Sequence, residues 1–397
     1  MKKKILFIIN EMINGGGQRS LINLLELIDY QQYDVELLLF KESGEFLEII
    51  PPEVKLVSQE EKLQCLYITD IGIIKNIKLL PTNIVHIVGT IISKCISKSG
   101  YNKGQVRWKN FYKKVVPTMQ KEYDIAVSYL EGESLYYLVD KVNAKRKISF
   151  IHTDYSKIKP DVKFDMEYFG KVDCVVGISN KCVEILKETF PEMSDKIKLL
   201  PNLISTKSIE RQAKQFYPNE YSEAADVIIL SIGRLTELKG FDMAIESAYL
   251  LKNKGIKFSW FILGQGELKK DLEELIKKYD VQDCVKLLGS RNNPYPYIKY
   301  ATIVVQTSRY EGKSMVLDEA KILSKPIVVT NYDTVKDQIN DEEGIIVDMK
   351  PQAISKGIIE LIGKIENYEL YLREHDYGNE KELRMYYKVF GGLDEDN

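Results

Sequence analysis

The sequence predicts an α/β protein made of two Rossmann-like, doubly wound domains that face each other across a cleft. The chain has 397 residues, more than a single hydrophobic core usually serves, so two domains are expected. Short apolar runs alternate with helical patterns from end to end, which is typical of parallel sheets covered by helices on both faces. Both halves also open alike, with an apolar strand, a glycine-containing loop and an amphipathic helix.

The expected strands form two series. In the first half they are residues 5–9, 35–40, 84–88, 125–129, 148–152, 174–178 and 197–200. In the second half they are residues 227–232, 258–263, 285–288, 303–306, 327–330 and 345–347. The polar stretch 205–225 separates the two series and predicts a linker. The expected domains are residues 1–204 and 226–372, and residues 373–397 are expected to form a helical tail that packs back toward the first domain.

Composition restricts the functional classes. The formal net charge of −2 disfavours a dedicated nucleic-acid-binding protein, so no nucleic acid partner is expected. The five cysteines are an odd number without a C-x-x-C pair, which predicts neither a disulfide framework nor a structural zinc site and fits a reducing cytoplasm. No apolar stretch approaches the ~18 residues that span a bilayer. We expect a cytoplasmic protein that can lie on a membrane but cannot cross one.

Loops that follow parallel strands meet at one edge of a sheet, beside helix N-termini that favour anions. The first such loop holds Gly15, Gly16 and Gly17, which allow the backbone to approach a ligand closely; a plain tight turn is the alternative. The motif is not G-x-G-x-x-G, and no acidic residue ends the second strand, which disfavours a dinucleotide dehydrogenase.

The loop after the strand at 227–232 contains Gly233, Arg234 and Lys239. Arginine offers a bidentate fork and lysine a point charge, so this pair can neutralise a diphosphate. The alternative is a solvated loop with two surface cations. The strand, the glycine and the following helix favour the phosphate site.

The loop after the strand at 303–306 contains Glu311, and the helix that begins near Ser314 carries Glu319 on its apolar stripe. A carboxylate at such a position needs a hydroxyl or a cation as partner. A ribose diol is the functional candidate, and a neighbouring loop is the structural one. His152 ends the strand at 148–152, where it can reach a ligand, whereas His86 is expected in the core on the strand at 84–88 and His375 in a charged tail.

Seven segments carry a family resemblance that extends over almost the whole chain. They are GGGQRSL, IHTDYS, VVGISN, PNLIS, SIGRLTELKGFD, ILGQGEL and EGKSMVLDEAKILSKPIVVT. With these segments the sequence resembles the retaining glycosyltransferases of family 4 (glycosyl transferases group 1), which have the GT-B fold. The Glu-Gly-Lys-Ser variant is similar to enzymes of bacterial surface polysaccharide assembly. The resemblance implies an N-terminal acceptor-side domain and a C-terminal nucleotide-sugar-binding domain.

The resemblance also implies roles for individual residues. Arg234 and Lys239 bind the donor phosphates, Glu319 binds the ribose, Glu311 lies by the donor sugar, and His152 contacts that sugar. The expected catalytic residues are His152, Glu311, Arg234 and Lys239. The expected donor-binding residues are Gly16, Gly17, Gly233, Arg234, Lys239, Gly264, Glu311, Gly312, Lys313, Ser314, Met315, Val316 and Glu319. The sequence departs from the family pattern at Gln18, Leu203 and Lys313, which affects the sugar and the acceptor more than the reaction type.

The implied reaction is transfer from a nucleoside diphosphate sugar, with UDP as the expected nucleotide, to a glycan or lipid-linked acceptor with retention of anomeric configuration. No metal and no cofactor are expected, because the histidines are isolated and no Asp-x-Asp motif occurs in the loops after the expected strands. Two alternatives remain: another GT-B enzyme such as a nucleotide-sugar epimerase, and a non-catalytic binding subunit with the same fold.

A basic segment predicts where the acceptor meets the protein. Residues 91–121 contain no Asp or Glu, and aromatic residues are interleaved with its cations. The expected acceptor or membrane contacts are Arg107, Trp108, Lys109, Lys113 and Lys114. Such a segment suits an anionic membrane surface. The alternative is an ordinary helix that packs its apolar side on the first domain.

Overall fold

The computed structural model describes residues 2–13, 15–57, 61–67, 80–97 and 99–391. The chain divides into two compact units, one of Met1–Leu203 with Asn379–Asn397 and one of Ile204–Gly378. None of the helices in the described part of the chain is long and apolar enough to cross a bilayer.

The N-terminal unit is built on a seven-stranded parallel sheet in the order β3-β2-β1-β4-β5-β6-β7. Its strands are β1 Lys3–Ile9, β2 Tyr33–Leu39, β3 Lys55–Leu56, β4 Glu122–Ser128, β5 Asn143–Ile151, β6 Cys174–Gly177 and β7 Ile197–Leu199. In the central pairing Ile5 lies opposite Val35 of β2 and Ile125 of β4. All side chains from Ile5 to Ile9 are buried, because helices cover both faces of the sheet.

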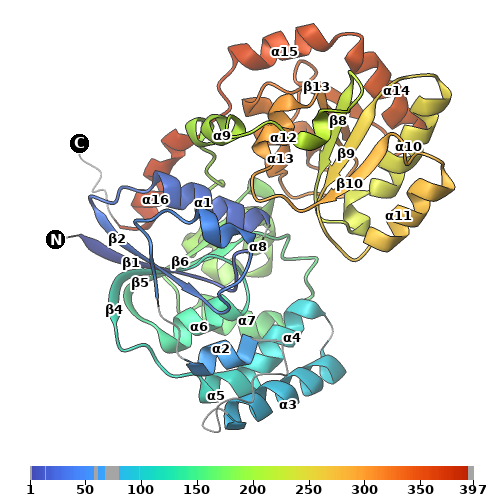
Figure 1. The fold of residues 1–397 in the computed structure, drawn as a ribbon. Coiled ribbons are helices and arrows are strands. Elements are labelled where there is room, and N and C mark those ends of the chain that lie inside the picture. The colour runs from blue at the N-terminus through green and yellow to red at the C-terminus, as the bar shows by residue number, and fades with distance from the viewer. Residues whose placement is uncertain (1, 14, 58–60, 68–79, 98, 392–397) are drawn as a thin grey trace. The chain divides into compact units, whose positions relative to one another are not determined.

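Alternate residues of β1 contribute to two separate cores, as the period of a strand requires. Leu6 and Ile8 pack with residues of α6 and α7, whereas Ile5, Phe7 and Ile9 pack with residues of α1 and α16, on the opposite face (Figure 1). The helices of this unit are α1 Gly16–Leu27, α2 Glu61–Tyr67, α3 Leu80–Ile96, α4 Gly100–Arg107, α5 Lys113–Val115, α6 Glu133–Lys141, α7 Val162–Phe169, α8 Asn180–Thr189 and α16 Leu383–Val389; a π-helical turn, Trp108–Tyr112, joins α4 to α5.

The C-terminal unit contains a six-stranded parallel sheet in the order β10-β9-β8-β11-β12-β13. Its strands are β8 Ile228–Ile232, β9 Ser259–Leu263, β10 Val285–Gly289, β11 Ile303–Gln306, β12 Ile327–Thr330 and β13 Gly344–Val347. Its helices are α9 Thr206–Ala213, α10 Phe241–Asn253, α11 Lys269–Lys278, α12 Tyr295–Tyr300, α13 Met315–Ile322, α14 Pro351–Ile362 and α15 Ile365–Glu374. One core lies beneath α10, α11 and α14, and the other beneath α9, α12 and α13.

The two parallel sheets confirm the predicted α/β class, and one expected strand is wrong. Residues 84–88 lie within the helix α3, so His86 is a helical residue, and its Nδ1 lies 3.0 Å from the hydroxyl of Tyr112. A short apolar run cannot distinguish a strand from a helix segment by periodicity alone. The two-residue strand β3 at the sheet edge was not expected.

Residues at the expected linker and tail belong to regular structure. Within 205–225, helix α9 packs against α12 and α13, and Ile209 and Tyr221 lie in the core of the C-terminal unit. At the other end, α16 packs in the N-terminal unit, where the Tyr386 hydroxyl donates to the carbonyl of Pro201. The chain therefore leaves the N-terminal unit after Leu203 and returns to it at Asn379.

Candidate functional site

Each parallel sheet has a switch point, where the order in which successive strands are added reverses. In the N-terminal unit β1 lies between β2 and β4, and in the C-terminal unit β8 lies between β9 and β11. Loops diverge on either side of such a switch point and leave room for a ligand at the carboxyl ends of the strands. The predicted site residues lie at the carboxyl ends of strands. Gly16 and Gly17 follow β1, and His152 follows β5, one strand beyond the switch point. The phosphate and glutamate loops follow β8 and β11.

In the N-terminal unit, the glycine loop lies against His152. A Cβ built on Gly17 would lie 2.5 Å from the Leu130 side chain and 3.6 Å from Cγ of His152, while one built on Gly16 would meet nothing within 4 Å. The N-cap residue of α1, Gly15, has no side chain to accept from the first turn. This N-cap leaves the first N–H groups of α1 without a side-chain cap, so they can meet an anion or a polar ligand.

His152 is held from its backbone and by ring packing. Its N–H donates to the Glu131 carboxylate at 3.0 Å, and its ring lies 5.1 Å from that of Tyr129 and 6.1 Å from that of Phe150. Both ring nitrogens are buried and have no hydrogen-bond partner within the described ranges. Burial lowers the pKa of His152 to about 4, so the imidazole is neutral at pH 7. A neutral ring in this position can exchange hydrogen bonds with a sugar hydroxyl.

Glycines bring three loops of the C-terminal unit close together. A Cβ on Gly264 would lie 1.8 Å from the carbonyl oxygen of Gly233, so the loops after β8 and β9 require glycine there. Gly240, with φ of +62°, approaches the Thr307 carbonyl of the β11 loop, at 2.1 Å from its built Cβ. This contact joins the β8 and β11 loops on which the cations and Glu311 stand.

The Glu311 carboxylate lies at the centre of a polar cluster. Its Oε1 accepts from Nζ of Lys239 at 2.5 Å, from Oγ of Ser308 at 2.7 Å and from the amide of Gln306 at 3.4 Å. The Lys239 and Glu311 side chains are 24% and 13% exposed. Lys239 is therefore a paired and half-buried cation, not the solvated surface cation of the alternative interpretation.

Arg234 differs from Lys239. Its side chain is exposed, and the described residues offer its guanidinium neither an ion pair nor a hydrogen bond. A free guanidinium beside two glycines can take a phosphate group without breaking an existing contact. The third expected cation, Lys313, lies 3.3 Å from the Asp318 carboxylate.

The N-terminus of α13 is open to an anion. Ser314 occupies the N-cap position, but its hydroxyl donates to Gln306 at 2.7 Å instead of capping the helix. The Gln338 amide fixes the same residue from both sides, since it accepts from the Ser314 N–H at 2.8 Å and donates to the Ser314 carbonyl at 3.0 Å. The N–H groups of Met315 and Val316 in the first turn are thus oriented without a side-chain cap.

Glu319 is buried on α13 with an exposure of 2%. The Tyr295 hydroxyl donates to its carboxylate at 3.3 Å. The Tyr295 hydroxyl is thus a structural partner for Glu319, which was the alternative to a ribose contact. The ribose contact of Glu319 stays a prediction, as do the cleft and the other carried-over roles.

Sequence reasoning missed several polar residues of these loops. Glu131 holds the backbone of His152, and Gln306, Ser308 and Gln338 hold Glu311 and the start of α13. Gln306 is the last residue of β11 and Glu131 follows β4. A polar residue at the end of a buried parallel strand is the signal that could have identified both.

The basic segment is only partly a surface. Trp108 is fully buried, and its Nε1 donates to Asp140 at 2.9 Å, so its expected membrane or acceptor contact is wrong. Lys113 pairs with the same Asp140 at 2.8 Å, and Arg107 pairs with buried Glu133 at 3.1 Å. The aromatic side of the segment packs on its own unit, while Lys109 and Lys114 are exposed.

Comparison with known proteins identifies the unit that carries the phosphate loops. Residues 214–377 match the model of the family "Glycosyl transferases group 1". The C-terminal unit is a group 1 glycosyltransferase domain. This match confirms the predicted resemblance, and assignment to family 4 agrees with it.

The relatives of this chain include glycosyltransferases of bacteria and archaea. An α-1,4-N-acetyl-D-galactosaminyltransferase of Campylobacter jejuni, named for a glycan carried on undecaprenol diphosphate, is 23% identical over 92% of this chain and 90% of its own length. An N-acetylgalactosaminyltransferase of the same organism is 31% identical over 46% of this chain, and an uncharacterized glycosyltransferase of Methanocaldococcus jannaschii is 31% identical over 45%. The chain spans 48% and 44% of those two relatives.

Solved structures share the fold of this chain over nearly its full length. Anabaena HepE, solved with UDP and glucose, has a TM-score of 0.66 at 14% identity and covers 98% of this chain and 100% of its own. Staphylococcus aureus TarM, solved as a mutant with UDP, has a TM-score of 0.65 at 14% identity and covers 98% of this chain and 99% of its own. These similarities confirm the GT-B fold class.

Proposed function

We propose that this chain transfers a sugar from a UDP-sugar to a glycan or lipid-linked acceptor in cell-surface polysaccharide assembly, with retention of configuration and without a metal. The observation that carries the proposal is the joining of Arg234, the Lys239–Glu311 pair and the uncapped N-terminus of α13 at one sheet edge of a group 1 domain. Relatives that act on undecaprenol-linked glycans and solved structures that hold UDP support it.

Each part of the donor would bind a different feature of the C-terminal unit. The exposed Arg234 and the N–H groups of Met315 and Val316 bind the diphosphate. Arg234 supplies a full positive charge, and the N–H groups supply the partial positive charge of the helix N-terminus. Lys239 supports them while it keeps Glu311 oriented toward the sugar. Glu319 binds the ribose hydroxyls, which compete with the Tyr295 hydroxyl for its carboxylate.

Bond cleavage would develop charge on the leaving phosphate, and Arg234, Lys239 and the α13 N–H groups stabilise that charge. The acceptor hydroxyl attacks the anomeric carbon on the face that the phosphate leaves. The C–O bond to the phosphate breaks, the new glycosidic C–O bond forms, and the hydroxyl proton passes to the departing phosphate. An oxocarbenium-like transition state suits this front-face route and requires no second catalytic carboxylate. Neutral His152 contributes a hydrogen bond to the sugar.

The acceptor would be presented to the N-terminal unit at the inner face of the plasma membrane. The exposed Lys109 and Lys114 and the undecaprenol-linked glycans named for the Campylobacter relatives support a lipid-linked acceptor. The protein would then be a peripheral membrane enzyme.

The test begins with thermal shift of the full chain against UDP, GDP and ADP and their common hexose derivatives. Stabilisation by UDP and one UDP-sugar is expected. Turnover with an undecaprenol-diphosphate-linked acceptor is then followed by NMR of the anomeric proton, with EDTA in a parallel reaction. No nucleotide binding would favour a binding subunit, and a changed sugar without acceptor would favour an epimerase. An inverted product or loss of activity in EDTA would contradict the retaining, metal-independent reaction.

A further inference from the structure

Helix α3 of the N-terminal unit has its polar side turned inward. Thr82 and Ser93 are buried with exposures of 3% and 1%, and His86 lies beside the Tyr112 hydroxyl. A Cβ on Gly89 would lie 3.3 Å from the Phe111 ring, so this small residue sets the close approach of the helix to its neighbour. The inward contacts hold α3 in this rotation.

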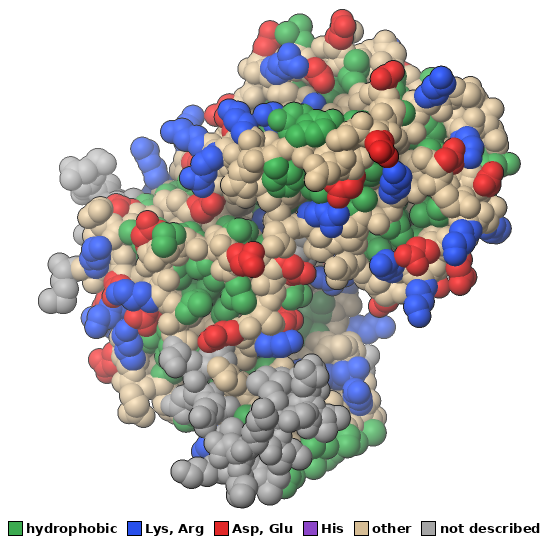
Figure 2. Space-filling model, in the orientation of Figure 1, with side chains coloured by type: hydrophobic (Ala, Val, Ile, Leu, Met, Phe, Trp, Pro, Cys, Tyr) green, Lys and Arg blue, Asp and Glu red, His purple; other side chains and the backbone are tan. Residues whose placement is uncertain are grey.

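The outward side of α3 is apolar. Its exposed hydrophobic residues, which we call the α3 outer face, are Ile84, Ile87, Val88, Ile91, Ile92 and Ile96. Ile91 is 57% exposed, and positions 84, 87, 88 and 91 follow the i, i+3, i+4, i+7 spacing of one helix side. Single exposed hydrophobic residues are ordinary, but a continuous patch indicates an interaction surface. Figure 2 shows hydrophobic side chains gathered at the lower right, where Figure 1 places α3.

The charge around this face indicates what covers it. Residues 80–121 contain eight Lys and Arg and no Asp or Glu. Lys94 on α3 itself, and Lys109 and Lys114 on the adjoining segment, are exposed. A second copy of this chain would bring these cations against their own equivalents. An anionic lipid surface instead offers acyl chains to the isoleucines and phosphates to the lysines.

We propose that the α3 outer face docks on an anionic lipid bilayer, with its isoleucines at the acyl boundary and Lys94 at the phosphate level. The sequence assigned this role to Arg107, Trp108, Lys109, Lys113 and Lys114. Of these, Arg107, Trp108 and Lys113 are paired or buried. The docking element is thus the helix that precedes them, and Lys109 and Lys114 supply only a surrounding positive field.

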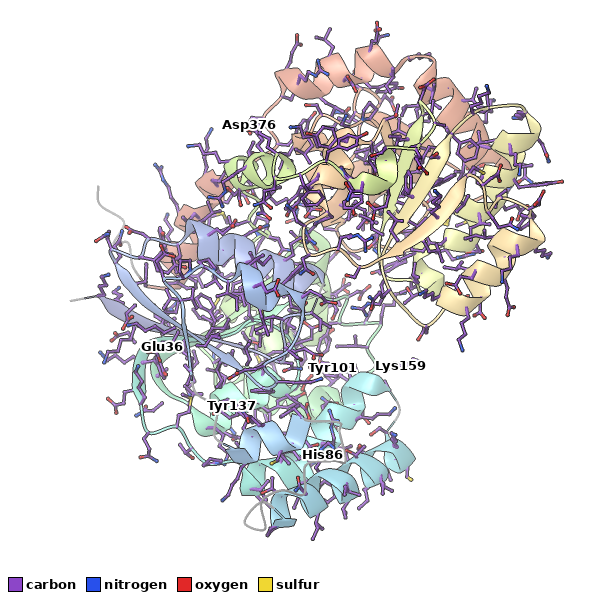
Figure 3. The ribbon with its side chains drawn as sticks, viewed as in Figure 1. Glu36, His86, Tyr101, Tyr137, Lys159 and Asp376 are labelled. Atoms are coloured by element: carbon purple, nitrogen blue, oxygen red, sulfur yellow. The ribbon has the colours of Figure 1, made fainter. Side chains whose placement is uncertain are left out.

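The docked helix adjoins the sugar-contacting edge of the same unit through α4. Helix α3 packs against α4, and the Tyr101 ring of α4 lies 3.5 Å from the Cβ that Gly132 would carry. Gly132 follows Glu131, whose carboxylate holds the His152 N–H. Tyr101 and His86 are labelled in Figure 3. This proximity rests on the proposed function, since it brings a lipid-linked acceptor to His152; the docking itself does not require catalysis.

The first test is co-sedimentation of the full chain with vesicles of phosphatidylcholine alone or with 30% phosphatidylglycerol. We expect binding to the anionic vesicles at low salt. Ile87→Ser with Ile91→Ser should reduce the partition coefficient at least about tenfold, because two half-exposed isoleucines leave the interface. Lys94→Glu should reduce it by about tenfold or more. Leu370→Ser on α15 is the matched apolar control, at 60% exposure, and the exposed Lys270→Glu on α11 is the charge control; both should bind as wild type.

A second measurement reports the environment of the helix directly. Both tryptophans, Trp108 and Trp260, are buried, so Ile91→Trp introduces one exposed indole. Its emission should be red in buffer and shift to the blue, with quenching by brominated lipids, when anionic vesicles are added. An emission already blue in buffer would mean that protein covers the face. A dimer in light scattering that the Ile87→Ser, Ile91→Ser variant dissociates would mean a second copy. Either result, or equal vesicle binding by all variants, overturns the proposal.

The two proposals fail separately. Stabilisation by UDP measures the donor site and should be the same in the α3 variants as in wild type. Vesicle binding without UDP binding would support the docking surface and contradict the proposed glycosyltransferase function. UDP binding without vesicle binding would support the donor site and contradict the docking surface.

Discussion

Lys239 and Arg234 occupy the same loop but differ in their contacts, and alanine substitutions should separate them. Lys239→Ala removes the cation that lies 2.5 Å from the Glu311 carboxylate, which is only 13% exposed. The carboxylate keeps Ser308 and Gln306 as donors. Removing one partner of a fully buried pair costs about 3–5 kcal/mol, and partial exposure reduces this to about 1–3 kcal/mol. Arg234→Ala breaks no ion pair or hydrogen bond with a described residue and should change stability by less than about 0.5 kcal/mol.

The corresponding melting temperatures are measurable, because 1 kcal/mol shifts a domain of this size by about 2–4 °C. Lys239→Ala should melt several degrees lower, and Arg234→Ala should melt as wild type. Both should lose kcat/KM by roughly 30- to 1,000-fold, which is about 2–4 kcal/mol of transition-state stabilisation.

The double variant Lys239→Ala, Glu311→Gln is the control. It removes the unpaired charge, so it should recover most of the lost stability and none of the activity. An unchanged melting temperature in Lys239→Ala, or no recovery in the double variant, would refute the ion-pair reasoning. Near-native turnover in either single variant would refute the phosphate assignment itself.

Three further outcomes are expected. Glu319→Ala should weaken UDP and the UDP-sugar alike in calorimetry, whereas Glu311→Ala should mainly lower turnover; equal loss of UDP affinity in both would remove the distinction. Because the pKa of His152 is about 4 in the folded state and about 6.5 when unfolded, its contribution to stability is present above pH 6.5 and is lost as the pH falls toward 4. Urea unfolding should show wild type losing up to about 3 kcal/mol more than His152→Gln between pH 7 and pH 4, and parallel pH profiles would contradict this. Asp165 is fully buried and accepts from three tyrosine hydroxyls and the Gln105 amide, so Asp165→Ala should destabilise the chain by about 3–5 kcal/mol in urea, far more than a surface substitution such as Lys270→Ala.

The sequence predicted most strands and the loops of the candidate site. Buried parallel strands are continuous apolar runs, and their carboxyl ends share an edge, so residues as far apart as Lys239 and Glu311 could be expected near each other. Their direct ion pair could not be expected, because register along a sheet edge does not determine side-chain partners.

Helix α3 and Trp108 show what the pattern could not supply. The run at 84–88 is apolar in either structure, and its outward orientation follows from contacts of His86 with Tyr112 and of Gly89 with Phe111. Trp108 is buried because Asp140, 32 residues away, accepts from its indole. Both outcomes depend on tertiary neighbours, which local sequence periodicity does not reveal.

The return of the chain at Asn379 affects how this protein is synthesised and divided. The Tyr386 and Phe390 side chains complete the core that contains Phe7, and Nε of Arg146 donates to the carbonyl of Val389. During synthesis the N-terminal unit therefore cannot complete its core until the segment that contains α16 has left the ribosome. The C-terminal unit is already complete at Gly378. Expression of residues 1–203 alone would leave an apolar groove on that unit, whereas residues 204–378 form a continuous piece that can be excised or exchanged between relatives as a cassette.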